Sequence, residues 1–325
     1  MEAPAAAQAA PRAMDWSPGN WWAYRATIGN QTMDVALIVH ERTADGFRLG
    51  TNLSVGFFGL PFNGNVTPDL NPRIGPNVWP LFAFPLADGK QWGYELFGHQ
   101  AKSTARAADV EVPTLGVRQG FHLDATSFGK VFARYDYSPD AAWFTRLEVI
   151  EPTDGSTVLL AELMSFGTDW AAAYYVEEVV RSVRIPYPAL PGAIDLEVPA
   201  GYLQARATLT AQAAAGAVTA TLRDDADRLL ARAEALVRGA DIDRASARTQ
   251  GGATWRLEHT GAGLGAVILE VTGVSATGPL AQPAGDAPEV DLAALLQSTL
   301  PARPHEGQTT STGAPVGVYG MSVAH

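Results

Sequence analysis

The chain has 325 residues, a formal net charge of -11 and 47% hydrophobic residues, which is typical of a globular protein large enough for two domains. The acidic balance, with Lys and Arg scattered along the chain, argues against a nucleic-acid partner. The absence of cysteine excludes disulfides, thiolate nucleophiles and cysteine-ligated zinc, and no apolar run approaches the roughly 18 residues that predict a membrane span.

Residues 1–14 are rich in Ala and Pro, which predicts a disordered tether of the kind that follows a cleaved signal segment. An ordinary disordered terminus is the alternative. Three N-glycosylation sequons follow, at Asn30, Asn52 and Asn65. Together these features favour an extracytoplasmic protein, secreted or at the cell surface, whose signal segment is missing from this chain.

Residues 15–187 are predicted to form an antiparallel β-domain, because apolar and polar residues alternate between turns rich in Gly, Pro, Asn and Asp. Asp45-Gly46 and Asp154-Gly155 are typical hairpin turns. The expected strands are Trp21–Ile28, Met33–Glu41, Phe47–Phe58, Gln91–Phe97, Ala107–Val112, Gly120–Thr126, Val131–Tyr137, Trp143–Glu151 and Thr157–Phe166.

One six-residue pattern, G-x-x-W-x-Y, occurs twice in this domain, as GNWWAY from Gly19 and as GKQWGY from Gly89. In a strand, Trp and Tyr two positions apart point to the same face. We therefore expect both copies to begin strands of one sheet and to supply aromatic side chains to one core.

Between the two copies, Gly59 to Pro80 reads as a long loop because Gly, Pro and Asn recur throughout it. Aromatic residues flank this loop, and two interpretations stay open. They could be core and rim of the sheet, or they could line an apolar cleft roofed by the loop. The candidate ligand-binding residues are Phe57, Phe58, Phe62, Trp79, Phe82 and Trp92.

A change of period at residues 170–183 predicts one helix, with Val176, Val179, Val180 and Val183 on a single face. A long final strand is the alternative. A proline-rich stretch then predicts a linker over residues 188–197.

Residues 198–278 are poor in aromatics and are expected to form a small immunoglobulin-like β-sandwich, because short alternating segments are separated by Gly-rich turns. Asp224 to Asp227 predict a hairpin turn with Leu229–Ala235 as the returning strand, and a helix from Asp224 to Arg238 fits nearly as well. Residues 279–325 predict a flexible tail. The fold class is therefore mainly β, with a curved antiparallel sheet or half-barrel carrying one helix, followed by a small sandwich.

The motifs that could carry chemistry are weak. Gly261 to Ala266 matches G-x-G-x-x-A, but a strand-like segment follows where a dinucleotide loop needs a helix, so we expect a hairpin turn. Asp224, Asp225 and Asp227 could offer oxygens to calcium, although the spacing of a helix-loop-helix calcium site is absent; solvated turn carboxylates are favoured. The six histidines show no metal-site spacing. We predict no catalytic residue, metal site or cofactor.

Two segments carry a resemblance. PLADGKQWGYEL, Pro85 to Leu96, resembles the first strand of secreted, lipoprotein-type β-domains of archaeal and bacterial envelopes, and Phe132 to Gly167 is similar to their closing meander. Those domains are similar to the half-barrel of lipoprotein carriers. The resemblance spans about residues 15–187 and implies a fold and a compartment but no catalytic residues. The chain departs from it in having no cysteine for lipid attachment.

These patterns predict a non-catalytic extracytoplasmic envelope protein, whose first domain binds a hydrophobic small molecule or lipid. The alternatives are a structural or adhesive component that contacts a cell-surface protein, and a hydrolase whose carboxylates or Ser-His pair converge only in the fold.

Overall fold

The structure is a computed structural model of the whole chain, and it describes residues 15–52, 64–74, 77–96, 99–186, 191–198, 200–236, 241–249, 252 and 254–277. Every helix or strand assigned in these ranges is a β-strand, and the strand pairs are antiparallel. Sixteen strands form one sheet, whose path runs from β16 to β7 without closing on itself. The predicted mainly-β antiparallel fold is confirmed.

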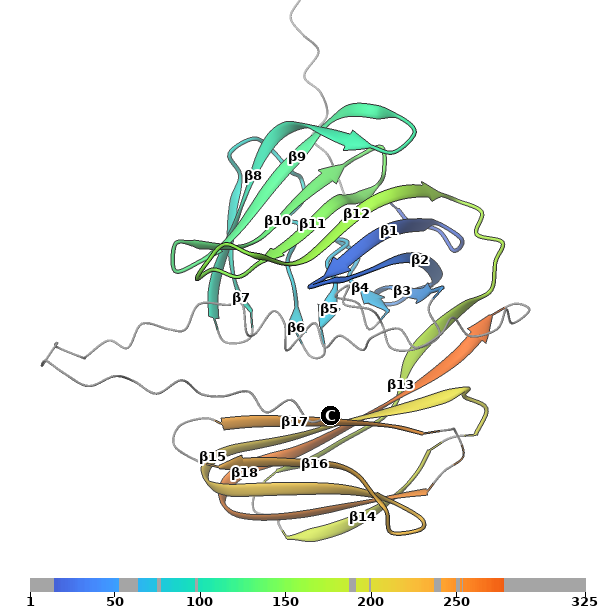
Figure 1. Cartoon of the computed structure of the whole chain (residues 1–325), viewed down its shortest axis with the longest axis vertical. Coiled ribbons are helices and arrows are strands. Elements are labelled where there is room, and N and C mark those ends of the chain that lie inside the picture. Colours follow the sequence, from blue (N-terminus) through green and yellow to red (C-terminus); the bar gives the residue numbers. More distant parts are fainter. Residues whose placement is uncertain are drawn as a thin grey trace, which may run out of the picture.

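The part of the sheet before residue 187 is strongly curved and bends over the short strands β4 (Asn65–Val66), β5 (Arg73–Ile74) and β6 (Asn77–Val78) (Figure 1). Each strand predicted between Trp21 and Phe166 overlaps an observed one. In spatial order the curved part contains β13 (Tyr174–Pro186), β3 (Gly46–Thr51), β2 (Gln31–Thr43), β1 (Trp21–Ile28), β12 (Thr157–Gly167), β11 (Trp143–Ile150), β10 (Lys130–Ser138), β9 (Gly116–Ser127), β8 (His99–Val112) and β7 (Gln91–Leu96).

The repeated G-x-x-W-x-Y pattern supplies one core from two places in this sheet, as expected. On β1, Trp22 and Tyr24 are buried, and on β7 Trp92 and Tyr94 pack against the same apolar cluster. The two indoles are held alike, because Trp22 Nε1 donates to the Ala141 carbonyl at 2.7 Å and Trp92 Nε1 to the Pro80 carbonyl at 2.9 Å. The repeat is therefore a packing device at the centre and at the edge of one sheet.

The predicted helix at 170–183 is wrong, because the alternative, a long strand, forms there as β13. Its backbone pairs with β18 (Thr254–Thr277) from Tyr174 to Pro186 and with β3 at Tyr175 and Val176. Valine is β-branched and favours extended backbone, and a long partner strand is present to satisfy its amides and carbonyls. The helical spacing of the valines was therefore accidental.

The second part of the chain is built on two long strands, β15 (Gln204–Asp224) and β18, which pair along their lengths with a register shift between Ala213 and Ala215. β17 (Asp241–Thr249) and β13 flank the half before the shift in β15, and β16 (Leu229–Leu236) and β14 (Gly192–Glu197) flank the other half. An alanine-rich apolar cluster, separate from that of the curved part, is buried among these strands.

In this second part, two predictions are corrected and one is confirmed. The expected linker at 188–197 contains β14, which pairs with β18. Of the two alternatives at 224–238, the hairpin is confirmed by β16, and the helix is wrong. Gly261 to Ala266 lies within β18 and not in a turn. Small residues are needed there because a Cβ on Gly265 would collide with the Gln212 carbonyl oxygen on β15.

Candidate functional site

The aromatic residues predicted to line a ligand cleft lie in the core where the structure describes them. Trp79 and Phe82 are 0% and 1% exposed, and the half-buried Trp92 packs against the same cluster. Phe57, Phe58 and Phe62 lie outside the described residues. Within the described part of the segment expected to roof a cleft, Trp79 thus belongs to the core, as does Phe82 just after it.

Hydrogen bonds and ring contacts hold Leu81 and Phe82, which follow this segment, in place. The Tyr135 hydroxyl donates to the Leu81 carbonyl at 2.6 Å, and the Phe82 ring lies 5.1 Å from that of Tyr137 in an edge-on contact. Asn71, which is buried, donates to the Phe82 carbonyl at 2.9 Å and accepts from its amide at 2.7 Å. The predicted function, a non-catalytic envelope protein with a hydrophobic ligand in this cleft, is therefore corrected: Trp79 and Phe82, which were assigned to the ligand, are core side chains.

The three sequon asparagines lie in different settings. Asn30 is exposed in the turn between β1 and β2, and Asn65 lies on β4. Asn52 accepts a hydrogen bond from the Ala36 amide at 2.8 Å through its side-chain oxygen. Their glycosylation stays a prediction, for which Asn30 is the most accessible of the three.

The opposite, outward face of the curved sheet carries a row of charged residues that sequence reasoning missed. In this row, residues from seven adjacent strands face one another in register, and from Asp136 onward their charges alternate. The row contains Arg106, His122, Asp136, Arg146, Glu162, Arg25 and Asp34. Strand order and register, which the sequence does not show, are needed to find it.

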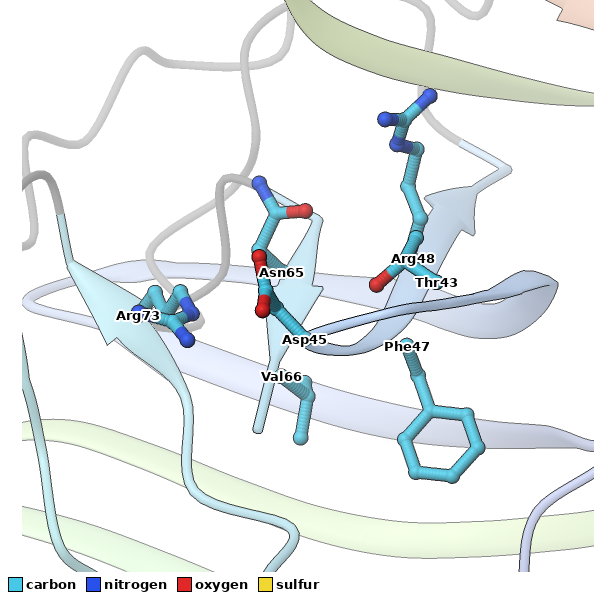
Figure 2. Close-up of a pocket in the computed structure, with 7 residues that line it drawn as sticks. All are labelled: Thr43, Asp45, Phe47, Arg48, Asn65, Val66 and Arg73. Carbon is cyan, nitrogen blue, oxygen red and sulfur yellow. The ribbon is translucent and has the colours of Figure 1, made fainter. Parts of the chain in front are cut away.

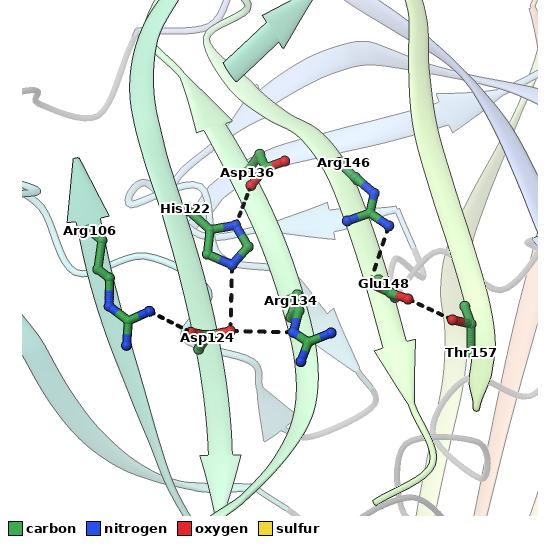
Figure 3. Close-up of polar contacts among 8 residues, drawn as sticks. All are labelled: Arg106, His122, Asp124, Arg134, Asp136, Arg146, Glu148 and Thr157. Atoms are coloured by element: carbon green, nitrogen blue, oxygen red, sulfur yellow. Dashed lines mark hydrogen bonds and ion pairs between the residues drawn. The ribbon is translucent and has the colours of Figure 1, made fainter. Parts of the chain in front are cut away.

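His122 lies at the centre of the best-connected part of this face, between two carboxylates (Figure 3). Its Nδ1 is 2.7 Å from Asp136 and its Nε2 is 3.5 Å from Asp124. Asp124 also contacts Arg106 at 3.3 Å and Arg134 at 3.5 Å. The hydrogen bond to Asp136 and the charges of both carboxylates raise the pKa of His122 above its usual value.

Next to this group, Glu148 on β11 accepts from the Thr157 hydroxyl at 2.6 Å and pairs with Arg146 at 3.2 Å (Figure 3). A general base needs a ring nitrogen that can take a proton, and both nitrogens of His122 face carboxylates instead. The Glu148 carboxylate, in turn, is already engaged by the Thr157 hydroxyl and the Arg146 guanidinium. This face is thus built for cross-strand pairing.

The pairing makes a prediction for pH. The pKa of His122 is raised in the folded protein. The contribution of His122 to the free energy of unfolding is therefore complete below the unfolded pKa of about 6.5, and it is lost as pH rises through the folded pKa. The side chain is about one third exposed, so we expect no more than about 1 kcal/mol. Urea unfolding between pH 5 and 9 should show His122→Gln closing its stability gap to wild type as pH rises. Parallel curves would contradict the assignment.

A separate pocket of about 340 Å³ lies beside the β2–β3 hairpin (Figure 2). Figure 2 shows Asp45, Asn65 and Arg73 gathered on one side, whereas Phe47 and Val66 point to the other side and the Arg48 guanidinium extends away. The pocket is lined by Thr43, Asp45, Phe47, Arg48, Asn65, Val66 and Arg73.

The backbone explains why Asp45 projects beside β4. Gly46 has φ of +135°, and a Cβ at this position would collide with the Val66 carbonyl oxygen. Glycine therefore lets the hairpin turn lie directly against β4, which places the Asp45 side chain beside Asn65. The sequence marked Asp45-Gly46 as a turn but gave no sign that Arg73, from another segment, lies across from it.

Charge is distributed unevenly around this pocket. Arg48 is occupied, because its guanidinium contacts Glu41 at 2.9 Å and Glu178 at 3.3 Å. Asp45 and Arg73 form no ion pair with any residue in the described ranges. The pocket thus presents one carboxylate and one guanidinium that are available to a bound molecule.

The acidic residues considered for calcium serve the hairpin between β15 and β16. The Asp224 carboxylate accepts from the Arg228 amide at 2.8 Å and from its side-chain Nε at 2.6 Å, and Asp227 lies 3.8 Å from Arg223. Within the described part of the chain, no group of three or more His, Cys, Asp or Glu is arranged to hold a metal ion. Nor does that part contain a helix able to cross a membrane.

Comparisons with known proteins assign no family. No family model and no curated protein matches the chain. A solved structure that matches is a glycoside hydrolase family 43 arabinoxylan arabinofuranohydrolase from Bacillus subtilis in complex with cellotetraose, 10% identical, with 78% of this chain and 79% of that chain covered and a TM-score of 0.16. Its TM-score is too low to assign an activity to this chain.

Proposed function

We propose that this protein binds a small polar molecule in the pocket beside the β2–β3 hairpin. The observation that carries the proposal is the pair Asp45 and Arg73, which face the same pocket with opposite charges and have no ion-pair partner among the described residues. The pocket volume of about 340 Å³ lies within the range of small-molecule sites, about 300–1,000 Å³.

The way the pocket is built supports this proposal. Its polar groups come from separate segments, with Asp45 in the hairpin turn, Asn65 on β4 and Arg73 on β5. β4 pairs with β3, and β5 pairs with β6, so the backbone positions are set by hydrogen bonds before any ligand arrives. A site that is already ordered loses less entropy on binding.

The test is a screen of polar metabolites by thermal shift, followed by calorimetry on the compounds that stabilise the protein. Asp45→Asn and Arg73→Gln should each weaken binding of a hit about tenfold or more, because each removes a charge-assisted hydrogen bond worth about 1.5–3 kcal/mol. Both side chains lie at the surface or near it, so the variants should fold normally.

Two control variants make the same charge changes elsewhere. Asp69 and Arg184 are exposed and have no ion pair with a described residue. Asp69→Asn and Arg184→Gln should therefore bind the same hits as wild type does. If no hit loses affinity in the pocket variants beyond what the controls lose, the proposed site is wrong.

We further propose that the curved part is a half-barrel and the second part a sandwich. The filled concave face supports the first statement, and the flanking of the two halves of β15 and β18 by different strands supports the second. An extracytoplasmic location is also proposed, supported by the resemblance to envelope domains and by the exposed sequon at Asn30. Mass analysis of protein secreted from a glycosylating host would test Asn30.

A further inference from the structure

We infer that the molecule bound beside the β2–β3 hairpin is a zwitterion of the α-amino-acid class, with its carboxylate on Arg73 and its ammonium group on Asp45. This inference rests on the proposed function and adds the chemical class of the ligand. It follows from the two charged side chains that face the pocket without an ion-pair partner among the described residues, and from Arg48, whose charge is already paired.

Arg73 is the cation that the pocket offers. A guanidinium presents a planar fork of donors that matches a carboxylate. Arg48 is closer to the hairpin in sequence, but its guanidinium is already bound by Glu41 and Glu178 and extends away from the pocket (Figure 2). A ligand carboxylate would therefore find its partner at Arg73.

Asp45 is the anion that the pocket offers. An ionised carboxylate only accepts hydrogen bonds, so its natural partner is an ammonium group with its three donors. Asn65 on β4 lines the same pocket beside Asp45 (Figure 2).

A ligand with a single charge fits this arrangement less well. An anion on Arg73 would lie near the Asp45 carboxylate and be repelled by it, and a cation on Asp45 would be repelled by Arg73. A molecule that carries both charges, on two groups bonded to the same carbon atom, avoids both repulsions. Selection by repulsion as well as attraction is how a site discriminates between related ligands.

The probes are the common α-amino acids, tested by calorimetry on the full chain. Each is compared with two derivatives: the N-acetyl derivative lacks the ammonium charge, and the carboxamide lacks the carboxylate. For any amino acid that binds, we expect each blocked derivative to bind about tenfold more weakly or worse. In Asp45→Asn, N-acetylation should no longer weaken binding, and in Arg73→Gln amidation should no longer weaken it; we call these two losses of affinity the N-acetylation penalty and the amidation penalty. Asp69→Asn and Arg184→Gln should retain both penalties.

The outcomes separate this inference from the proposed function. If N-acetyl derivatives bind as well as the free amino acids, the ligand is an anion, and the zwitterion is overturned while the pocket stands. If no amino acid binds but other polar metabolites do, and they depend on Asp45 and Arg73, the inference is overturned in the same way. If both penalties persist unchanged in the two pocket variants, the amino acid binds elsewhere, and the proposed site fails as well.

Discussion

Replacing Phe82 by alanine should lower the free energy of unfolding of the curved part by about 3–5 kcal/mol, the usual cost of deleting a buried aromatic side chain. Phe82 is 1% exposed, and its ring meets those of Tyr137 at 5.1 Å and Tyr135 at 5.9 Å. The substitution removes both the apolar transfer energy and the ring contacts, and the surrounding strands cannot collapse onto the cavity.

Denaturant unfolding followed by tryptophan fluorescence measures this loss, because seven of the eight tryptophans precede residue 171 and report on the curved part. Phe128→Ala is the matched control, since that ring is 43% exposed and its removal should cost well under 1 kcal/mol. If Phe82→Ala were as stable as the control, the aromatic residues would line an open cleft, and the assignment of the core would be wrong.

Replacing Asn71 by leucine should cost about 2–4 kcal/mol. The Asn71 side chain bonds both the amide and the carbonyl of Phe82, and its loss leaves two buried backbone groups without partners, each at about 1–3 kcal/mol. Leucine is close in size, so the loss reports on hydrogen bonds more than on volume. These two hydrogen bonds, the Asn71 bridge, therefore hold the segment before Phe82 against the core.

Asn71→Asp gives this prediction a signature in pH. An ionised carboxylate can accept from the Phe82 amide but cannot donate to its carbonyl, whereas a protonated carboxyl can do both. The introduced carboxyl should thus have its pKa raised above the unfolded value of about 3.9. Relative to wild type, the variant should gain stability as pH falls toward that range. A stability difference that does not change between pH 7 and pH 4 would show that the bridge is unimportant.

Much of this fold could be predicted from the sequence because its strands are amphipathic. On β1 the buried Trp22, Tyr24 and Ala26 alternate with less buried residues, and period-two alternation is a local signal. The Asp-Gly turns added the hairpin positions, and the repeated G-x-x-W-x-Y pattern indicated strands that share one core.

The sequence was misleading where a local pattern had two solutions. The valines of β13 fit a helical face as well as a strand, and only the presence of β18 as a partner decides between them. The glycines from Gly261 to Gly265 suggested a turn, but they lie within β18, and Gly265 allows the close approach of β18 to β15. In both cases the deciding contact comes from a segment far away in the chain.

The candidate site was beyond sequence reasoning for the same reason. Asp45 was recognised only as a turn residue, and Arg73 lies in a segment that looked like an unstructured loop. Their proximity depends on β4 pairing with β3 and on Gly46 allowing the turn to lie against Val66. The aromatic residues gave the stronger signal in the sequence, but that signal came from the core.

The most direct test of this account is a map of backbone amide chemical shifts during titration with a polar compound that binds. We expect the shifts to concentrate at Asp45, Gly46, Asn65 and Arg73 and to leave the amides of Phe82 and Trp92 unchanged. Shifts concentrated at Phe82 and Trp92, with Asp45 and Arg73 unmoved, would contradict it and return the ligand to the concave aromatic side of the sheet.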